Sequence, residues 1–206
     1  GATGNLDTKH VLLNGSSNDA GNYASAGVRF EESTERLSGV ATFRWRGLVN
    51  ELPVDDAHYA AFYLYYMNSG FRSTSYYFSY SDAGTIRFQN AGTEVASFSV
   101  GSADMFELTA DLDARVLSLR INDQLVHEQT GAFVGEGLVG MGFFSSVSSG
   151  STGDAAPLAI DDFTYQWLDT QSLPPGHHVV ISANEDVLAR DFGFAPPALE
   201  FGSSGT

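Results

Sequence analysis

The sequence has no cysteine and little positive charge. Without cysteine, the chain has no disulfide bond, no thiolate metal site and no cysteine nucleophile. Ten Lys and Arg stand against 25 Asp and Glu, which gives a formal net charge of -15. Such a charge repels the phosphates of nucleic acids and the surface of an anionic membrane. We therefore expect neither nucleic acid nor membrane insertion among its interactions.

Long apolar runs and helical periodicity are also missing. The longest uncharged apolar run is AAFYLYYM at 60–67, far short of the roughly 18 residues of a membrane-spanning helix. No apolar stripe with a period of about 3.6 residues is sustained over the length of an ordinary helix. The opening GATGNLDTKH lacks the basic and apolar regions of a signal peptide, as expected if the chain begins after a processing site or inside a longer protein.

The sequence does contain apolar residues that alternate with polar ones, segment after segment. With 43% hydrophobic and 17% charged residues, the chain has enough apolar material for a substantial core. The pattern predicts an all-β protein. The expected strands are 9–14, 25–30, 39–47, 58–67, 74–81, 84–90, 94–100, 105–113, 115–122, 124–129, 137–144 and 157–167.

Turn residues separate these strands. DAG at 82–84, NAG at 90–92, LDAR at 112–115 and ND at 122–123 supply residues that tolerate a positive φ in tight hairpins. About twelve strands in this length favour two antiparallel sheets packed face to face as a β-sandwich, a jelly roll. The predicted core residues are Phe43, Trp45, Phe62, Leu64, Ile86, Phe88, Phe106, Leu108, Leu117, Leu119, Ile121, Met141 and Phe143.

Two segments depart from the strand pattern. SSVSSGSTGDAAP at 145–157 has the composition of a surface loop, and LDTQSLPPG after Trp167 has that of a linker. We predict a jelly-roll domain at 1–168, followed at 169–206 by the linker and a C-terminal β-hairpin extension.

The stretch HYAAFYLYYM at 58–67 raises the question of function, because both of its faces are rich in aromatic residues. If Phe62 and Leu64 face the core, alternation turns Tyr63 and Tyr65 outward. The same rule turns outward the polar residues between the core residues of neighbouring strands. The hypothesis is that one outward face collects the ligand-binding residues Arg44, Arg46, Tyr63, Tyr65, Arg87 and Gln89.

This set of side chains suits a saccharide. An aromatic ring stacks on the apolar face of a pyranose, while Arg and Gln hydrogen-bond to hydroxyls or carboxylates. An acidic polysaccharide, such as a uronate polymer, would suit the arginines. The alternative interpretation is that these are ordinary β-surface residues in cross-strand pairs and cation–π contacts.

The last strands follow a familiar order. FELTADLDARVLSLRINDQLVHEQTG is followed by GLVGMGFF and then by APLAIDDFTYQW. This order resembles the concanavalin A-like lectin and glucanase superfamily, over residues 5–168. The resemblance implies a jelly-roll fold and a carbohydrate-related role, in a superfamily that includes lectins, carbohydrate-binding modules, laminin-G-like modules, glycosidases and lyases.

The tail carries a second resemblance. HVVISANEDVLARDFGF at 178–194 resembles the closing hairpin of the SdrD B-like modules of bacterial surface proteins. This implies a piece of a larger secreted or cell-surface bacterial protein, with neighbouring domains in the parent chain. The alternative is that 179–181 and 187–192 form a hairpin that pairs with an edge of the sandwich.

The first resemblance also implies a structural calcium ion, since jelly-roll modules of this kind often hold calcium through an Asp of the closing strand. Asp162, which strict alternation places on the face of Ile160, is the preferred ligand, and Asp161 and Asp19 are further candidates. Carboxylate and carbonyl oxygens are the ligands that calcium prefers. EF-hand spacing is absent, and the Asn/Gly/Ser loop at 14–22 needs no metal to be a loop.

No catalytic residue is predicted. A retaining glycosidase similar to the laminarinase group would show Glu-x-Asp-x-x-Glu on one strand, and that spacing does not occur. The Gln-Ile-His and Arg-Ser-Glu-Leu-Arg motifs of alginate lyases are missing as well. A lyase arrangement of His58 and Tyr63 with Arg44 and Arg46 stays open as an alternative.

The leading hypothesis is a non-catalytic, lectin-like module that binds a polysaccharide or glycan, within a larger secreted or surface bacterial protein. One alternative is a polysaccharide lyase or glycoside hydrolase of the same fold. Another is a structural or adhesive spacer module.

Overall fold

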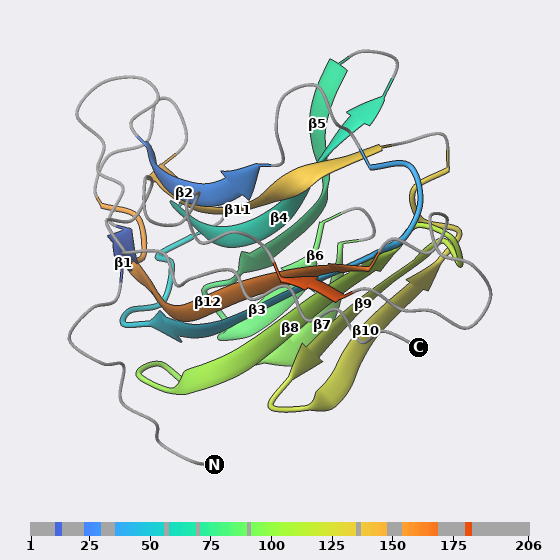
Figure 1. Cartoon of the computed structure of the whole chain (residues 1–206). Coiled ribbons are helices and arrows are strands. Elements are labelled where there is room, and N and C mark those ends of the chain that lie inside the picture. Colours follow the sequence, from blue (N-terminus) through green and yellow to red (C-terminus); the bar gives the residue numbers. More distant parts are fainter. Residues whose placement is uncertain are drawn as a thin grey trace.

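The computed structural model describes residues 11–13, 23–29, 36–55, 58–68, 71–89, 92–134, 137–147, 154–168 and 180–182. Within these ranges the secondary structure is entirely β, in two antiparallel sheets packed face to face (Figure 1). The prediction of an all-β sandwich is confirmed. Over the same ranges, no helix is long and apolar enough to cross a membrane.

The described strands form one sheet of seven and one sheet of six. In the seven-stranded sheet the order is β1 (Val11–Leu13), β12 (Leu158–Leu168), β3 (Val40–Val49), β8 (Ala103–Asp111), β9 (Val116–Ile121) and β10 (Gln124–Thr130), with β13 (Val180–Ser182) beside β12. In the six-stranded sheet the order is β2 (Tyr23–Arg29), β11 (Gly137–Val147), β4 (His58–Asn68), β5 (Phe71–Tyr80), β6 (Thr85–Phe88) and β7 (Thr93–Ser97).

β1 to β12 correspond to the predicted strands, with ends displaced by a few residues. The turn chemistry is confirmed too, because Asn122 and Asp123 between β9 and β10 both have positive φ, at 50° and 65°. Gly84, between β5 and β6, has a φ of 74°. Local sequence therefore sets the hairpins.

The core between the sheets is dominated by aromatic rings. Trp45 stacks on Phe106 with centroids 5.1 Å apart, and it meets Phe62 at 5.0 Å and Phe143 at 5.2 Å edge to face. These are the offset and perpendicular arrangements that aromatic pairs prefer. All of the predicted core residues are buried except Ile121, which is partly buried against the core.

β13 pairs with β12, on the side of β12 that faces away from β3, with Trp167 opposite Ile181. The hairpin alternative expects such pairing with an edge of the sandwich. The remainder of the tail, including 187–192, lies outside the described residues. The resemblance to SdrD B-like modules stays a prediction, as do the domain boundaries at 1–168 and 169–206.

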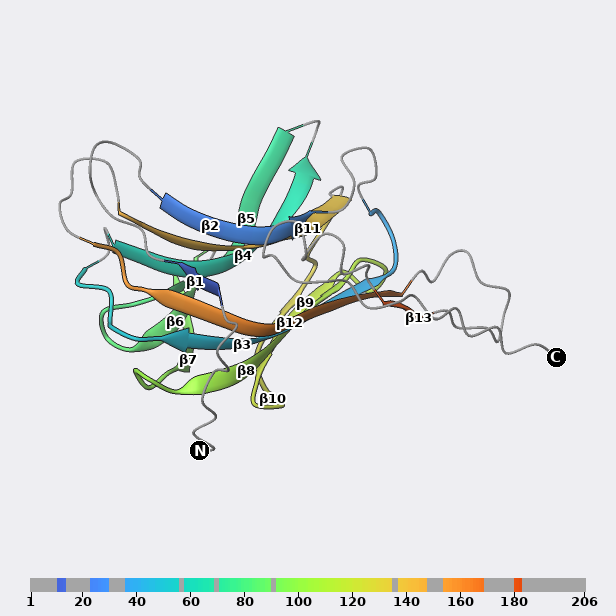
Figure 2. The same cartoon turned by 60° about the vertical axis from the view of Figure 1, so that its left-hand side comes forward.

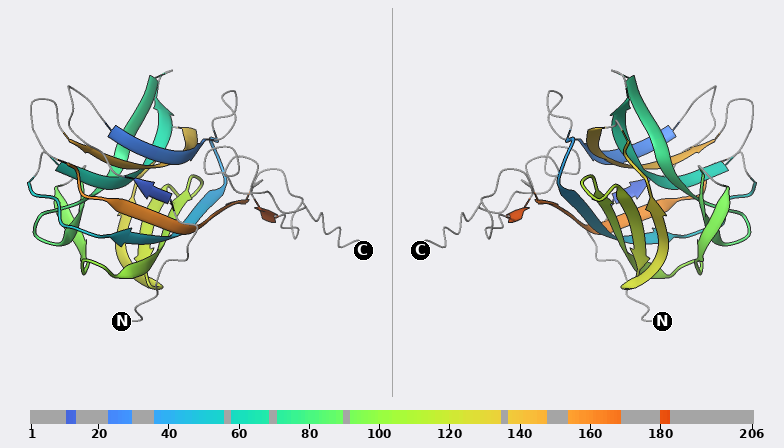
Figure 3. Two further views of the ribbon diagram at one scale, coloured as in Figure 1. Left: turned by 90° about the vertical axis from the view of Figure 1, so that its left-hand side faces the viewer. Right: turned by 90° about the vertical axis from the view of Figure 1, so that its right-hand side faces the viewer.

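The six-stranded sheet is bowed. β2, β11 and β4 curve so that their hollow side points away from the seven-stranded sheet (Figures 2 and 3). We call the outer face of the six-stranded sheet the concave face, and the outer face of the seven-stranded sheet the convex face.

Candidate functional site

The six predicted binding residues do not share one face. Tyr63 and Tyr65 lie on β4, and Arg87 lies on β6 with Gln89 just after it, all in the six-stranded sheet. Arg44 and Arg46 lie on β3, in the seven-stranded sheet. The prediction of a single face is therefore wrong. Alternation separates inward from outward within a strand, but the outward directions of two packed sheets are opposite.

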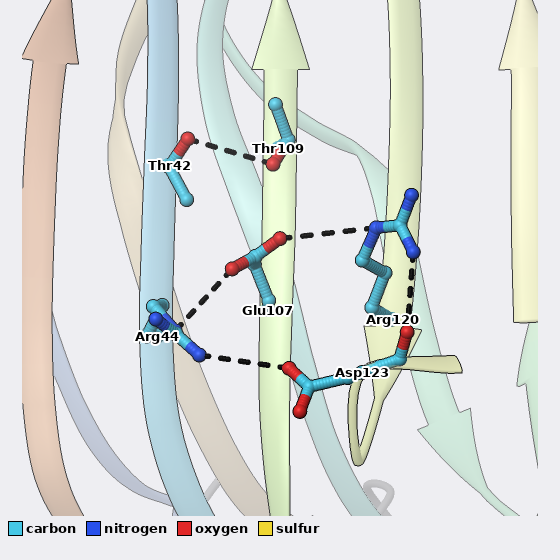
Figure 4. A network of polar contacts seen from close by, with 6 residues as sticks. All are labelled: Thr42, Arg44, Glu107, Thr109, Arg120 and Asp123. Atoms are coloured by element: carbon cyan, nitrogen blue, oxygen red, sulfur yellow. Dashed lines mark hydrogen bonds and ion pairs between the residues drawn. The ribbon is translucent and has the colours of Figure 1, made fainter. Parts of the chain in front are cut away.

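On the convex face the arginines belong to a cross-strand network of charges (Figure 4). Arg44 Nε lies 3.3 Å from Glu107 and its Nη2 lies 3.8 Å from Asp123. Arg120 Nε lies 3.9 Å from the same Glu107, and its Nη1 donates to the Asp123 carbonyl at 3.1 Å. For Arg44, the alternative interpretation therefore applies: it is an ordinary β-surface residue in cross-strand ion pairs.

The predicted calcium ligands meet at a β-bulge in β12. The register with β3 shifts between Asp161 and Thr164, and Asp162 has a φ of 51°. The extra residue places Asp162 outward, with 54% of its side chain exposed and its carboxylate 3.1 Å from Arg46 Nε. Its predicted position on the face of Ile160 is therefore wrong, because a bulge adds one residue to the alternation.

Asp161 is buried, and one of its carboxylate oxygens accepts a hydrogen bond from the Asp162 backbone N–H at 2.8 Å. Asp19 lies outside the described residues. In the part of the chain that the structure describes, no three His, Asp or Glu side chains are grouped to hold a metal ion. Calcium binding stays a prediction.

A cluster of aromatic rings occupies the middle of the concave face. Tyr63 is 5% exposed, and its hydroxyl lies 2.5 Å from that of Tyr65, whose ring is perpendicular to it at 4.7 Å. Tyr77 stacks against Tyr63 at 6.1 Å, and Phe144 approaches it edge-on at 6.5 Å. Tyr63 is thus a supporting ring, while Tyr65, Tyr77 and Phe144 are partly exposed.

Glycine makes room for this arrangement. Gly142 on β11 pairs with Tyr63 on β4, which in turn pairs with Tyr77 on β5. A Cβ atom at Gly142 would lie 2.6 Å from both Cζ and Oη of Tyr63. The Tyr63 ring therefore lies across the place where a side chain of β11 would stand.

Beside the ring cluster, the concave face has a polar hollow of about 520 Å³. It involves the loop before β4 and the ends of β4, β5, β6 and β7. The residues around it are Asp55, His58, Ser79, Tyr80, Ser81, Arg87, Gln89, Gly92 and Glu94.

Hydrogen bonds hold Gln89 against β5. Gln89 donates from its Nε2 to Ser79 Oγ at 2.6 Å and from its backbone N–H to the Tyr77 carbonyl at 2.9 Å. Burial, together with the nearby Asp104 carboxylate, raises the pKa of Tyr80. The Tyr80 phenol is consequently neutral at physiological pH.

The charged residues of the hollow occur in pairs. Arg87 Nε lies 3.6 Å from Glu94. His58 is buried, and its Nδ1 lies 2.7 Å from the Asp55 carboxylate. The lyase arrangement of His58 with Arg44 and Arg46 is wrong, because the two arginines lie on the convex face. Arg87 is the arginine that shares the hollow with His58.

Several residues of this site were not among the predicted binding residues. Tyr77 and Phe144 alternate with the buried Phe78 and Phe143, so the period-two rule already marks them as outward aromatic residues. The place of Glu94 beside Arg87 depends on the pairing of β6 with β7. That pairing has a register shift, which the sequence pattern does not predict.

Comparison with known proteins places the fold. No protein-family model matches the sequence, and neither does any curated protein. Among solved structures, alginate lyase AlgAT5 from polysaccharide lyase family 7 has a TM-score of 0.58 at 12% identity, over 79% of this chain and 81% of that one. Alginate lyase A1-II', of the same family, has a TM-score of 0.54 at 10% identity, over 81% and 84%.

A sialidase has a TM-score of 0.58 at 9% identity, and the match covers 78% of this chain but 15% of the sialidase. The chain has the concanavalin A-like jelly-roll fold. At such identities the likeness extends to the fold alone, and function must be argued from the site.

Proposed function

We propose that the chain is a non-catalytic, lectin-like module that binds polysaccharide on its concave face, within a larger secreted or surface bacterial protein. The observation that carries the proposal is the continuity of two features. The rings of Tyr65, Tyr77 and Phe144 are partly exposed and pack around Tyr63. Ser79, which lines the polar hollow with Gln89, follows Tyr77 by two residues on β5 and therefore shares its outward side.

This combination matches the chemistry of a sugar, which has an apolar C–H face and a rim of hydroxyls. Rings supply stacking surface at a low entropy cost, and amide and hydroxyl groups supply hydrogen bonds in both directions. The support of Tyr65 by the buried Tyr63 holds one such ring in place before a ligand arrives, which lowers the cost of binding.

The test compares rings on the concave face with a residue on the convex face. Tyr65→Ala and Tyr77→Ala each remove a ring, and we expect each to weaken retention on a polysaccharide by about 5- to 30-fold, since an aromatic contact is worth ~1–2 kcal/mol. Arg44→Ala is the control and should leave retention unchanged. Affinity gel electrophoresis over a panel of polysaccharides measures the effect.

The outcomes are distinct. An absence of retention on every polysaccharide would overturn the proposal, as would an equal loss in the Arg44→Ala variant. Tyr65→Phe keeps the ring but removes the hydroxyl that meets Tyr63. It should retain most of the binding.

A polysaccharide lyase is the second candidate, and the pairing of His58 with Asp55 favours it. A lyase needs a base and a group that neutralises the uronate carboxylate. His58 and Arg87 line the same hollow. Incubation with uronate polymers, followed by the ultraviolet absorbance of the unsaturated product, tests this candidate. An active wild type that His58→Ala inactivates would support it, and an inactive wild type would exclude it for those polymers.

A further inference from the structure

The concave face presents charge that is already compensated. Among the side chains that the structure describes on this face, Arg87 is the one cation, and it lies 3.6 Å from Glu94. The exposed fractions of the two side chains are 30% and 54%, so the pair is accessible to a ligand. A ligand carboxylate at Arg87 would have to compete with Glu94 at short range.

The second carboxylate of the hollow is also engaged. Asp55 contacts the imidazole of His58 at 2.7 Å, and His58 is buried. The other polar side chains around the hollow are neutral, namely Ser79, Ser81 and Gln89. Two carboxylates therefore accompany one guanidinium and one imidazole, on a chain whose formal net charge is -15.

We infer that the concave face takes an uncharged polysaccharide and discriminates against polyuronates. The inference rests on the proposed function, because it names the ligand class of the same face. A polyuronate carries one carboxylate on each sugar, and in the hollow each would meet Glu94 beside Arg87 and Asp55 beside His58. Among the described side chains of the hollow, no cation therefore lacks a carboxylate neighbour that competes with the ligand. An amino-sugar polymer would need carboxylates without a counter-group, whereas Asp55 faces His58 and Glu94 faces Arg87.

This ligand class differs from the uronate polymer that the arginine count of the sequence favours. It also argues against a polyuronate lyase. The difference arises because Arg44 and Arg46 lie on the convex face, and because Arg87 shares its charge with Glu94.

The first experiment measures the affinity of the wild-type chain for polymers of three charge classes at low and high salt. The probes are laminarin as a neutral polymer (with mannan and galactan as further neutral probes), alginate as a polyuronate and chitosan as an amino-sugar polymer. We expect binding to a neutral polymer whose Kd changes less than about twofold with salt, because no net charge is exchanged. Alginate and chitosan should bind measurably more weakly than the neutral polymer.

The second experiment changes the ion pair. Glu94→Gln removes the acidic charge that lies beside Arg87, so we expect alginate affinity to rise at least about fivefold, with binding of the neutral polymer within about twofold of the wild type. Glu107→Gln is the matched control. It makes the same change of net charge between Arg44 and Arg120 on the convex face, and it should not affect alginate binding.

The outcomes separate the inference from the proposed function. Wild-type binding that is tightest to alginate or chitosan, and that weakens with salt, would overturn the ligand class while leaving saccharide binding intact. Equal effects of Glu94→Gln and Glu107→Gln would overturn the role of the Arg87 pair. Failure to bind any of the polymers would instead count against the proposed function.

Discussion

Substitution of Gly142 by alanine tests how the concave face is built. The added Cβ would lie 2.6 Å from Tyr63 Oη, well inside contact distance. Tyr63 cannot simply swing away, because it is 5% exposed and packed against Tyr65, Tyr77 and Phe144. The ring must therefore shift against its neighbours and give up its contact with the Tyr65 hydroxyl.

The expected cost follows from these contacts. Overpacking costs about 1–3 kcal/mol, and loss of one hydrogen bond costs about 1 kcal/mol more. Replacing glycine within a strand returns roughly 0.5–1 kcal/mol of backbone entropy. The net loss in the free energy of unfolding is about 1–3 kcal/mol, which lowers the Tm of a domain of this size by about 3–10 °C.

Scanning calorimetry on four proteins checks the reasoning: the wild type, Gly142→Ala, Tyr63→Ala and the double variant. Tyr63→Ala opens the space that the new methyl group needs, so Gly142→Ala should cost almost nothing in that background. A Gly142→Ala variant with the wild-type Tm, or two losses that simply add in the double variant, would refute the account of the ring cluster.

Three further predictions follow from the described contacts. Burial lowers the pKa of His127, so its neutral form is favoured in the folded state, and stability that is full above pH ~6.5 should decline as the pH falls below that value. His127→Leu should flatten the dependence of Tm on pH between about pH 7 and pH 5. An unchanged profile would contradict this. Gly39→Ala should destabilise the fold more than Gly131→Ala, by roughly 1–3 kcal/mol in urea unfolding. Both positions have a positive φ, but a Cβ at Gly39 would lie 2.5 Å from the Leu168 carbonyl oxygen, whereas one at Gly131 would meet nothing within 4 Å. If Asp162 helps to hold calcium, EDTA should lower the Tm and Asp162→Asn should remove that response, whereas a Tm that EDTA leaves unchanged would end the calcium prediction.

Much of the fold was predictable because its signals are local. Alternation identified the strands and correctly placed Trp45 and Phe62 inward and Arg44 and Tyr65 outward. Asn122 and Asp123 announced their hairpin, since few other residues adopt a positive φ at low cost. These features depend on one residue and its chain neighbours.

The candidate site was predictable only in part. The sequence identified Tyr63, Tyr65, Arg87 and Gln89 as outward, but not that Tyr63 is covered. Its burial depends on Gly142, which comes much later in the chain and reaches β4 only through the pairing of β11. Likewise, Asp162 left the expected face because of a bulge that strict alternation cannot anticipate.

By itself, the sequence determined which side of each strand faces the core, because a side chain's direction along a strand repeats every two residues. Only the tertiary structure decided which sheet each strand joins. β3 and β4 follow one another in the chain yet lie in opposite sheets, so their outward arginines and tyrosines point in opposite directions. The physical reason is that the sheet a strand joins is set by long-range hydrogen bonding and core packing, and the alternation within one strand does not specify its partners.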